Sequence, residues 1–417
     1  MFQRIVAIVF IFIVAAIAWG ALGATILSRT YDSSATSSSR VESTWGTEQN
    51  QAPPAASFTT QVSKKEETME NGKKIVKTVT ENVVTSLPLE SSTIDVNLDL
   101  GHRQKGLLWY STYKVDFAGR YSFRNTSDKE QIVAFDLEFP TSRAIYDNLT
   151  FVVDGTPLTI NTTDNAVTGT AKIGAGKVAQ LTVGYSSQGL NEWRYSFGAG
   201  NVSQVRDFNL NMTTNFKDID FPDNTLSPSE KTQTGNGWHL TWSYKNLLSG
   251  YQIAMAMPEK LQPGPLAGRI SFFAPVSLFF FFFLMLIITT MRGIDLHPMN
   301  YFFLAAAFFS FHLLLAYLVD HISIHASFAI AAAVSIFLVV SYLRLVVGIR
   351  FASREAALAQ FIYLVMFSYA FFLKGFTGLA ITIGSVLTLF VVMQVTGRVR
   401  WNEKFKVRSA EPEIELS

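Results

Sequence analysis

The chain has 417 residues, of which 49% are hydrophobic and 16% are charged, and its formal net charge is +2. A composition this apolar is typical of a protein with several membrane-spanning segments, and the small net charge gives no reason to expect a nucleic-acid partner. Cysteine is absent, which excludes disulfides, thiol nucleophiles and cysteine-ligated metals.

Six apolar segments are long enough, or nearly so, to cross a membrane, which takes about 20 residues. They cover residues 5–27, 270–291, 300–319, 327–347, 356–373 and 379–395. The first could instead be a signal peptide with a small-residue cleavage site at 21–23. Its apolar run is longer than the roughly 7–15 residues of such a region, which favours an uncleaved anchor. The tight turn at 374–378 predicts an αα-hairpin between the last two spans.

The basic residues beside these spans predict their orientation, because cytoplasmic loops carry an excess of Lys and Arg. With the N-terminus inside, the cytoplasmic side receives Arg4, Arg292, Arg350, Arg354, Arg398, Arg400, Lys404, Lys406 and Arg408. The short outer loops then hold only Lys374. Both termini are therefore predicted to be cytoplasmic, and the long polar region is predicted to lie outside the membrane.

Five regions are expected along the chain. Residues 1–28 form a cytoplasmic stub and membrane anchor, and 29–62, rich in Ser, Thr, Ala and Pro, form a polar tether outside the membrane. Residues 63–268 form a β-rich outer domain and 269–397 a bundle of five transmembrane helices. Residues 398–417 form a tail that is first basic and then acidic.

The polar region alternates apolar and polar residues with the period of two that is typical of strands. Asn71-Gly72 and Asp154-Gly155 are strong hairpin signals, and the glycines at 174 and 176 predict a third hairpin. Many short strands without long helical periods predict an antiparallel β-sandwich.

No sequence motif for catalysis or cofactor binding is found. The chain lacks a Walker loop, HExxH, GxSxG and a dinucleotide fingerprint. Asp218 and Asp220 lack the spacing of an EF-hand loop and are interpreted as turn-capping residues. The sequence therefore predicts no catalytic residue, no cofactor and no enzymatic activity.

Polar side chains within the bundle are the candidate functional residues. His312 lies in the middle of an apolar helix, where an ionisable residue is by default a candidate for function, and a hydrogen bond to a neighbouring helix is expected. Asp320, His321 and His325 follow at the helix end. Three roles stay open for them: a zinc site, a pH-sensitive contact to the outer domain, and structural anchoring.

The other candidates in the bundle are expected to serve packing or interfacial contacts. Arg344 can reach the headgroups from the inner end of its helix, and Lys374 lies in the outer turn. Ala380, Gly384 and Thr388 form a stripe of small residues spaced by four, which allows two helices to approach closely.

Several segments resemble the CreD family of bacterial inner-membrane proteins. They are HPMNYFF, DHI and SYLRLVVG in the bundle, GRVRW after the last span, and HRQKGLLWYSTYKVDFAGRYSF in the outer region. The resemblance covers roughly residues 91–401. It implies an uncleaved N-terminal span, a large periplasmic domain, a helical bundle and a link to cell-envelope integrity.

The favoured hypothesis is a non-enzymatic scaffold whose periplasmic β domain binds envelope partners or lipids. The expected partners are the lipid bilayer and either envelope proteins or a second copy of the chain. The alternatives are a transporter or stress sensor that uses polar bundle residues, and an envelope hydrolase. Against transport, the bundle has few polar residues for a substrate route and no inverted repeat is evident.

Overall fold

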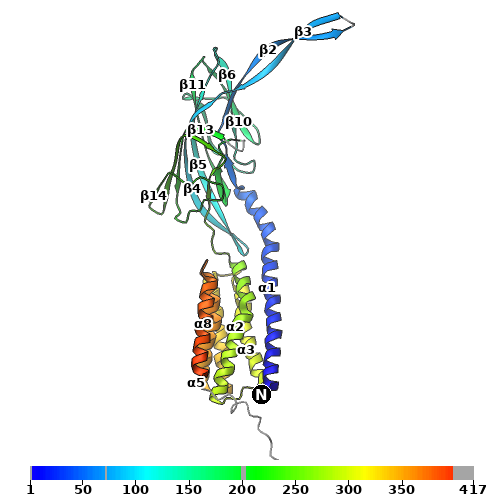
Figure 1. Ribbon diagram of the computed structural model, residues 1–417, viewed down its shortest axis with the longest axis vertical. Coiled ribbons are helices and arrows are strands. Elements are labelled where there is room, and N and C mark those ends of the chain that lie inside the picture. The colour runs from blue at the N-terminus through cyan, green and yellow to red at the C-terminus, as the bar shows by residue number, and fades with distance from the viewer. Residues whose placement is uncertain (1, 71–72, 199–202, 398–417) are drawn as a thin grey trace, which may run out of the picture. The chain divides into compact units, whose positions relative to one another are not determined.

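A computed structural model describes residues 2–70, 73–198 and 203–397 (Figure 1). The chain divides into two compact units, which we call the bundle unit and the β unit. The bundle unit comprises Met1–Ala35, Gly106–Leu108 and Leu261–Ser417, and the β unit comprises Thr36–Lys105 and Trp109–Lys260. The C-terminal tail expected at 398–417 lies outside the described residues.

Within the described residues, six helices are long and apolar enough to cross a membrane, as predicted. Four of them are continuous α-helices that lie wholly in the bundle unit: α2 (Pro263–Arg292), α3 (Pro298–Leu318), α4 (Ile324–Val346) and α8 (Thr377–Thr396). The first, α1 (Phe2–Trp45), is the longest. The remaining helix, Ile349–Phe372, is built from α5 (Ile349–Phe351), η1 (Ala352–Ala356), α6 (Ala357–Gln360), η2 (Phe361–Met366), α7 (Phe367–Tyr369) and η3 (Ala370–Phe372).

The helix ends carry recognisable stop and start residues. Pro263 and Pro298 stand in the first turns of α2 and α3, where a missing backbone N–H costs nothing. Gly293 ends α2 in a left-handed conformation with φ of 67°. The Ser323 side chain caps α4 by accepting a hydrogen bond from the Ala326 amide. Short connections therefore follow α2 and α3.

The prediction of a polar tether at 29–62 was wrong. Instead, α1 continues to Trp45, and strands begin at Gln49 and Ala55. A helix that is already nucleated can extend through weak helix formers at little cost. Hydroxyl groups in this stretch also bond one turn away, as Ser28 does to Asp32 and Ser38 to Glu42.

The described part of the β unit contains three sheets. Their strands are β1 (Gln49–Gln51), β2 (Ala55–Glu70), β3 (Lys73–Ser86), β4 (Leu89–Lys105), β5 (Leu108–Arg124), β6 (Gln131–Glu138), β7 (Asp147–Val153), β8 (Thr156–Pro157), β9 (Ile160–Thr162), β10 (Ala166–Ile173), β11 (Val178–Leu190), β12 (Glu192–Tyr195), β13 (Ser203–Thr214), β14 (Glu230–Thr234), β15 (Gly237–Ser249) and β16 (Ile253–Ala256). The orders are β1-β12-β16, β3-β2-β6-β10-β9 and β14-β15-β13-β4-β5-β11-β7-β8.

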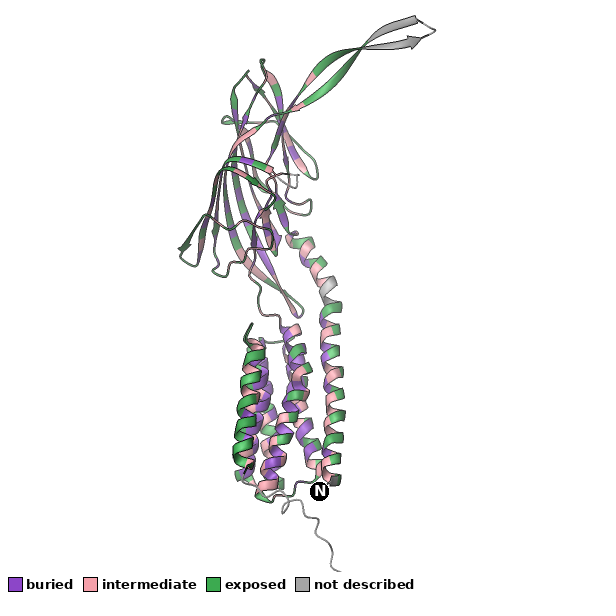
Figure 2. Ribbon diagram, in the orientation of Figure 1, coloured by how far each residue is buried: buried purple, intermediate pink, exposed green. Residues whose placement is uncertain are grey.

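The two larger sheets share one hydrophobic core, as a sandwich requires. Phe123 of β5 and Phe135 of β6 meet edge to face across it, with ring centroids 5.9 Å apart. Figure 2 shows buried residues alternating with exposed ones along these strands. Most pairings are antiparallel, as predicted, but β13 pairs with β4 in parallel and β1 with β12.

The hairpin signals had different outcomes. Asp154 and Gly155 both have positive φ, 48° and 81°, and join β7 to β8 in the expected kind of turn. The turn at 174–176 forms no hairpin, because β10 pairs with β6 and β11 with β5, so this turn joins two sheets. Asn71-Gly72 lies outside the described residues, although β2 and β3 pair on both sides of it.

The β2–β3 hairpin extends beyond the sheet that carries it. β2 pairs with β6 only from Ala55 to Phe58, whereas it pairs with β3 from Ser57 to Glu70. The remainder is a two-stranded ribbon, which we call the arm, and it projects from the rest of the β unit (Figure 1). Both edges of the arm are free in the described chain.

Candidate functional site

Two ion pairs join α1 to the segments that flank α3. Arg4 donates to Asp295 at 2.8 Å, and Arg29 donates to Asp320 at 2.8 Å. Each arginine is separated from its acid by 291 residues, so α1 and α3 run parallel and in register. At 1.5 Å per residue the two pairs lie about 37 Å apart along the helix, slightly more than the hydrocarbon thickness of a bilayer.

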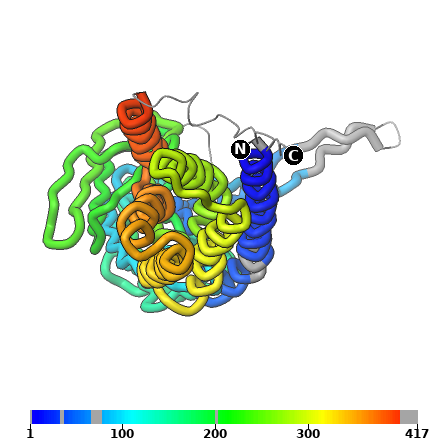
Figure 3. The backbone as a smooth tube through the Cα atoms, turned by 90° about the horizontal axis from the view of Figure 1, so that it is seen from below, coloured from blue at the N-terminus to red at the C-terminus, as the bar shows by residue number. Residues whose placement is uncertain are grey.

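Between these ion pairs, Trp19 forms the centre of the α1–α3 contact. Its side chain is fully buried, and its ring meets the rings of Phe308, Phe309 and His312 edge to face. Because of these contacts, Trp19 anchors the first helix to the bundle. The end-on view shows α1 on one side of the bundle and α8 on the opposite side (Figure 3).

His312 is fully buried in this contact, but its bonding differs from the expectation. Its Nδ1 lies 3.3 Å from the Phe308 carbonyl of its own helix rather than from a neighbouring helix. Its Nε2 has no hydrogen-bond partner within the described chain. The imidazole is held against Trp19 by ring packing, with centroids 5.6 Å apart.

The structure does not bring Asp320, His321 and His325 together as a metal site. Asp320 is paired with Arg29, which also contacts the Tyr317 ring, and His325 packs on Phe372. Within residues 2–70, 73–198 and 203–397, no three His, Cys, Asp or Glu residues are grouped to hold a metal ion.

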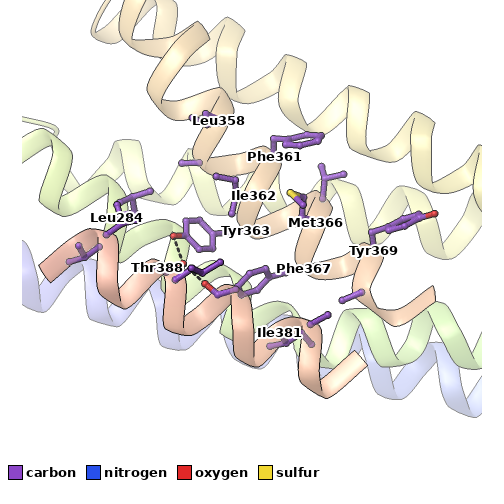
Figure 4. Close-up of a pocket in the computed structure, with 18 of the residues that line it drawn as sticks. Leu284, Leu358, Phe361, Ile362, Tyr363, Met366, Phe367, Tyr369, Ile381 and Thr388 are labelled. Carbon is purple, nitrogen blue, oxygen red and sulfur yellow. Dashed lines mark hydrogen bonds between the residues drawn. The ribbon is translucent and has the colours of Figure 1, made fainter. Parts of the chain in front are cut away.

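A lateral pocket lies in the bundle between α2, the 349–372 helix and α8 (Figure 4). Its volume is about 970 Å³, and its walls are almost wholly apolar. Leu284 contributes from α2, Phe361 and Met366 from the 349–372 helix, and Ile381 from α8. α8 is loosely covered, since Leu387 and several neighbours are more than half exposed.

Two pairs of polar side chains lie at or near the pocket, while the buried Glu355 Oε2 and Gln360 Oε1 atoms have no hydrogen-bond partner in the described chain. The Tyr363 hydroxyl donates to Thr388 Oγ1 at 2.9 Å, and Thr388 donates to the Gly384 carbonyl (Figure 4). Deeper in the bundle, Gln360 donates to Ser335 Oγ, which donates to a backbone carbonyl of α3. The pocket surface is thereby left apolar.

The wall formed by the 349–372 helix is unusually wound. It contains two π-helical stretches, Ala352–Ala356 and Phe361–Met366. Such windings are rare and often mark functional sites. Here the second stretch places Tyr363 and Met366 on the pocket wall.

The small-residue stripe on α8 faces this same wall. Ala380, Gly384 and Thr388 all line the pocket. A Cβ on Gly384 would lie 2.8 Å from the Phe367 ring, so the glycine permits the close approach expected there. Arg344 and Lys374 are exposed outside it, on α4 and in the turn before α8.

The sequence analysis did not predict three contacts: the two ion pairs and the packing of Trp19 between α1 and α3. The equal spacing of Arg4 to Arg29 and Asp295 to Asp320, 25 residues each, was a usable signal for parallel helices. The burial of Trp19 had no comparable signal, because tryptophan in a first span also suits a membrane interface.

The comparisons with known proteins identify a family. A family model described as inner membrane protein CreD matches residues 1–279 and 266–402, which confirms the resemblance drawn from the bundle motifs. Comparison with curated proteins gave no match. Among solved structures, a candidate nutrient binding protein from Legionella pneumophila has a TM-score of 0.33 at 10% identity, over 47% of this chain and 71% of that one.

An M1 zinc metallopeptidase from Deinococcus radiodurans has a TM-score of 0.24 at 12% identity, over 40% of this chain and 42% of the peptidase. The chain thus spans about two fifths of the peptidase, and neither structural likeness is strong enough to support an inference about chemistry. The match to the family model extends over both units. The chain belongs to the CreD family of inner membrane proteins.

Proposed function

We propose that this inner membrane protein is a non-enzymatic scaffold for envelope integrity, whose β unit lies in the periplasm and binds other envelope proteins. The arm is the observation that carries the proposal. A two-stranded ribbon is at best marginally stable on its own. Its unpaired edges are ready templates for another strand.

One face of the arm continues the hydrophobic core. Phe58 of β2 is buried in the sandwich, and Val62 lies four residues further along the same face. The register sets Val83 opposite Thr60 and Val79 opposite Lys64, which adds both valines to that face. Val62, Val79 and Val83 are 48%, 41% and 40% exposed. The arm therefore offers apolar contacts as well as strand edges, the two elements of strand addition.

Buried tyrosines fasten the core of the β unit. Burial raises the pKa of Tyr113, Tyr185 and Tyr195 well above the usual value. The Tyr185 hydroxyl donates to Gln51 Oε1 at 2.6 Å, and the Tyr113 hydroxyl donates to the Glu192 carbonyl. These hydrogen bonds give the β unit the rigid core that a binding scaffold needs.

The polar contacts of the bundle favour a scaffold over a transporter. Gln360 with Ser335 and Tyr363 with Thr388 form two separate pairs. Each pair ends in a donation to a backbone carbonyl, and Gln360 Oε1 has no partner in the described chain. A transport path requires polar groups that follow one another across the membrane.

The proposed orientation rests on the charges at the helix ends. Arg4, Arg292, Arg350 and Arg354 lie at the end of the bundle where α1 begins and α2 ends. At the opposite end of the bundle, the short turn before α8 carries Lys374. The positive-inside rule then places both termini in the cytoplasm and the β unit in the periplasm.

Photocrosslinking in living cells tests the role of the arm. A photoreactive amino acid replaces Val83 on the arm or, as the control, Leu248 on β15, which is 73% exposed in the same unit. We expect a discrete adduct with another envelope protein from Val83 and none from Leu248.

Two results would contradict the proposal. One is an adduct of twice the chain's mass as the sole product, which would identify self-association instead. The other is equal background labelling at both positions in cells where the protein is present at its normal level.

A further inference from the structure

We propose that the lateral pocket of the bundle binds the acyl chains of one anionic phospholipid, with the headgroup at the end of the bundle that carries Arg292. The proposal goes beyond the scaffold function and does not depend on the arm. It rests on the volume, the lining and the charge at one end of the pocket.

The volume and lining fit hydrocarbon. About 970 Å³ lies near the top of the range of roughly 300–1,000 Å³ for ligand pockets. Tyr363 and Thr388 satisfy each other, so the surface offers an entering molecule almost only carbon. A large apolar cavity is not filled stably by water. In a bilayer, the pocket is surrounded by the acyl chains of lipids, and one lipid can fill it.

The pocket runs along most of the membrane thickness. Its lining on the 349–372 helix extends from Glu355 to Ala370, which is about 22 Å at 1.5 Å per residue. The exposed residues of α8, among them Leu387 and Val391, border the opening. An extended chain can therefore enter sideways from the lipid.

The charge at one end selects the headgroup. Glu355 lines that end and is ion-paired with Arg292, whose side chain is 55% exposed. Arg350 and Arg354 are exposed on the same helix start. Three arginines beside one carboxylate leave a net positive charge, and arginine matches the geometry of a phosphate. Leu373 and Ala380 line the other end, and Lys374, which follows Leu373, lacks that bidentate geometry.

Native mass spectrometry of the full chain in detergent tests the proposal with two added lipids, dioleoylphosphatidylglycerol and dioleoylphosphatidylcholine. Ile381→Trp fills the pocket from α8. Ile383→Trp is its matched control, because Ile383 is on the same helix, is 50% exposed and does not line the pocket. We expect wild type and Ile383→Trp to retain one phosphatidylglycerol, and Ile381→Trp to retain about tenfold less.

A second pair of variants tests the headgroup. Arg354→Gln should lower the preference for phosphatidylglycerol over phosphatidylcholine by about fivefold. Arg120→Gln, at an exposed position of β5 in the β unit, should leave the preference unchanged.

Two outcomes would overturn the inference: equal lipid retention by the two tryptophan variants, or equal retention of the two lipids by wild type. The melting temperature in lipid-free detergent checks that each variant is folded. If Ile381→Trp does not fold, Met366→Trp fills the pocket from the opposite wall, and the same comparison with Ile383→Trp decides.

Discussion

Replacing Trp19 by alanine is expected to destabilise the bundle unit by about 3 kcal/mol, the low end of the range for truncating a buried aromatic side chain. The ring is fully buried against Phe308, Phe309 and His312, and its removal opens a cavity between α1 and α3. The low end applies because moving an apolar side chain from lipid into the bundle gains little free energy, unlike moving it from water. The loss of stability therefore comes mainly from the packing contacts that Trp19 makes.

Thermal unfolding in detergent measures this effect, followed by aggregation or by tryptophan fluorescence. Ile17→Ala is the control, because Ile17 lies on α1 with 69% exposure and faces away from the contact. The melting temperature of Trp19→Ala should fall by several degrees and that of Ile17→Ala should hardly change. Equal shifts for both would mean that α1 is not packed through Trp19.

The second large effect is expected in the β unit, from Gly237→Ala. A Cβ at this position, the first residue of β15, would lie 1.7 Å from the Thr214 carbonyl oxygen and 2.5 Å from its carbon. Backbone atoms cannot rotate away as a side chain can, so β13 and β15 must separate. Overpacking of this kind costs about 1–3 kcal/mol, and occasionally more. We expect the upper end.

Gly235→Ala, two residues earlier in the same turn, is the matched control. Gly235 has a φ of 58° and nothing within 4 Å of the added Cβ, so its substitution costs only the left-handed conformation, about 1–2 kcal/mol. Chemical denaturation of the purified protein, followed by near-ultraviolet circular dichroism, should rank Gly237→Ala as the less stable. A reversed ranking would refute the close approach of β13 to β15.

The sequence predicted the architecture because two physical signals are strong. Long apolar runs identified all six spans, and the alternation of Tyr113, Val115 and Phe117 identified β5 as a half-buried strand. Asp154-Gly155 also identified its turn, since few residue pairs accept two positive φ angles.

What the sequence missed depends on tertiary contacts. The Ser- and Thr-rich stretch after Leu27 suggested a tether, but it continues a helix that is already formed. The π-helical stretches at 352–356 and 361–366 leave no clear period in an apolar segment. The pairing of Arg29 with Asp320 also needed a parallel register between distant helices.

Accessibility of single cysteines tests most directly whether the β unit lies outside the membrane. The chain has no native cysteine, so each introduced thiol reports alone. Ser91→Cys on β4 and Ser323→Cys between α3 and α4 should react with a membrane-impermeant maleimide in intact spheroplasts. Ser353→Cys, at the start of the 349–372 helix, should react only after lysis. Labelling of Ser353→Cys in intact spheroplasts, with Ser91→Cys protected, would contradict the proposed orientation and with it the periplasmic scaffold.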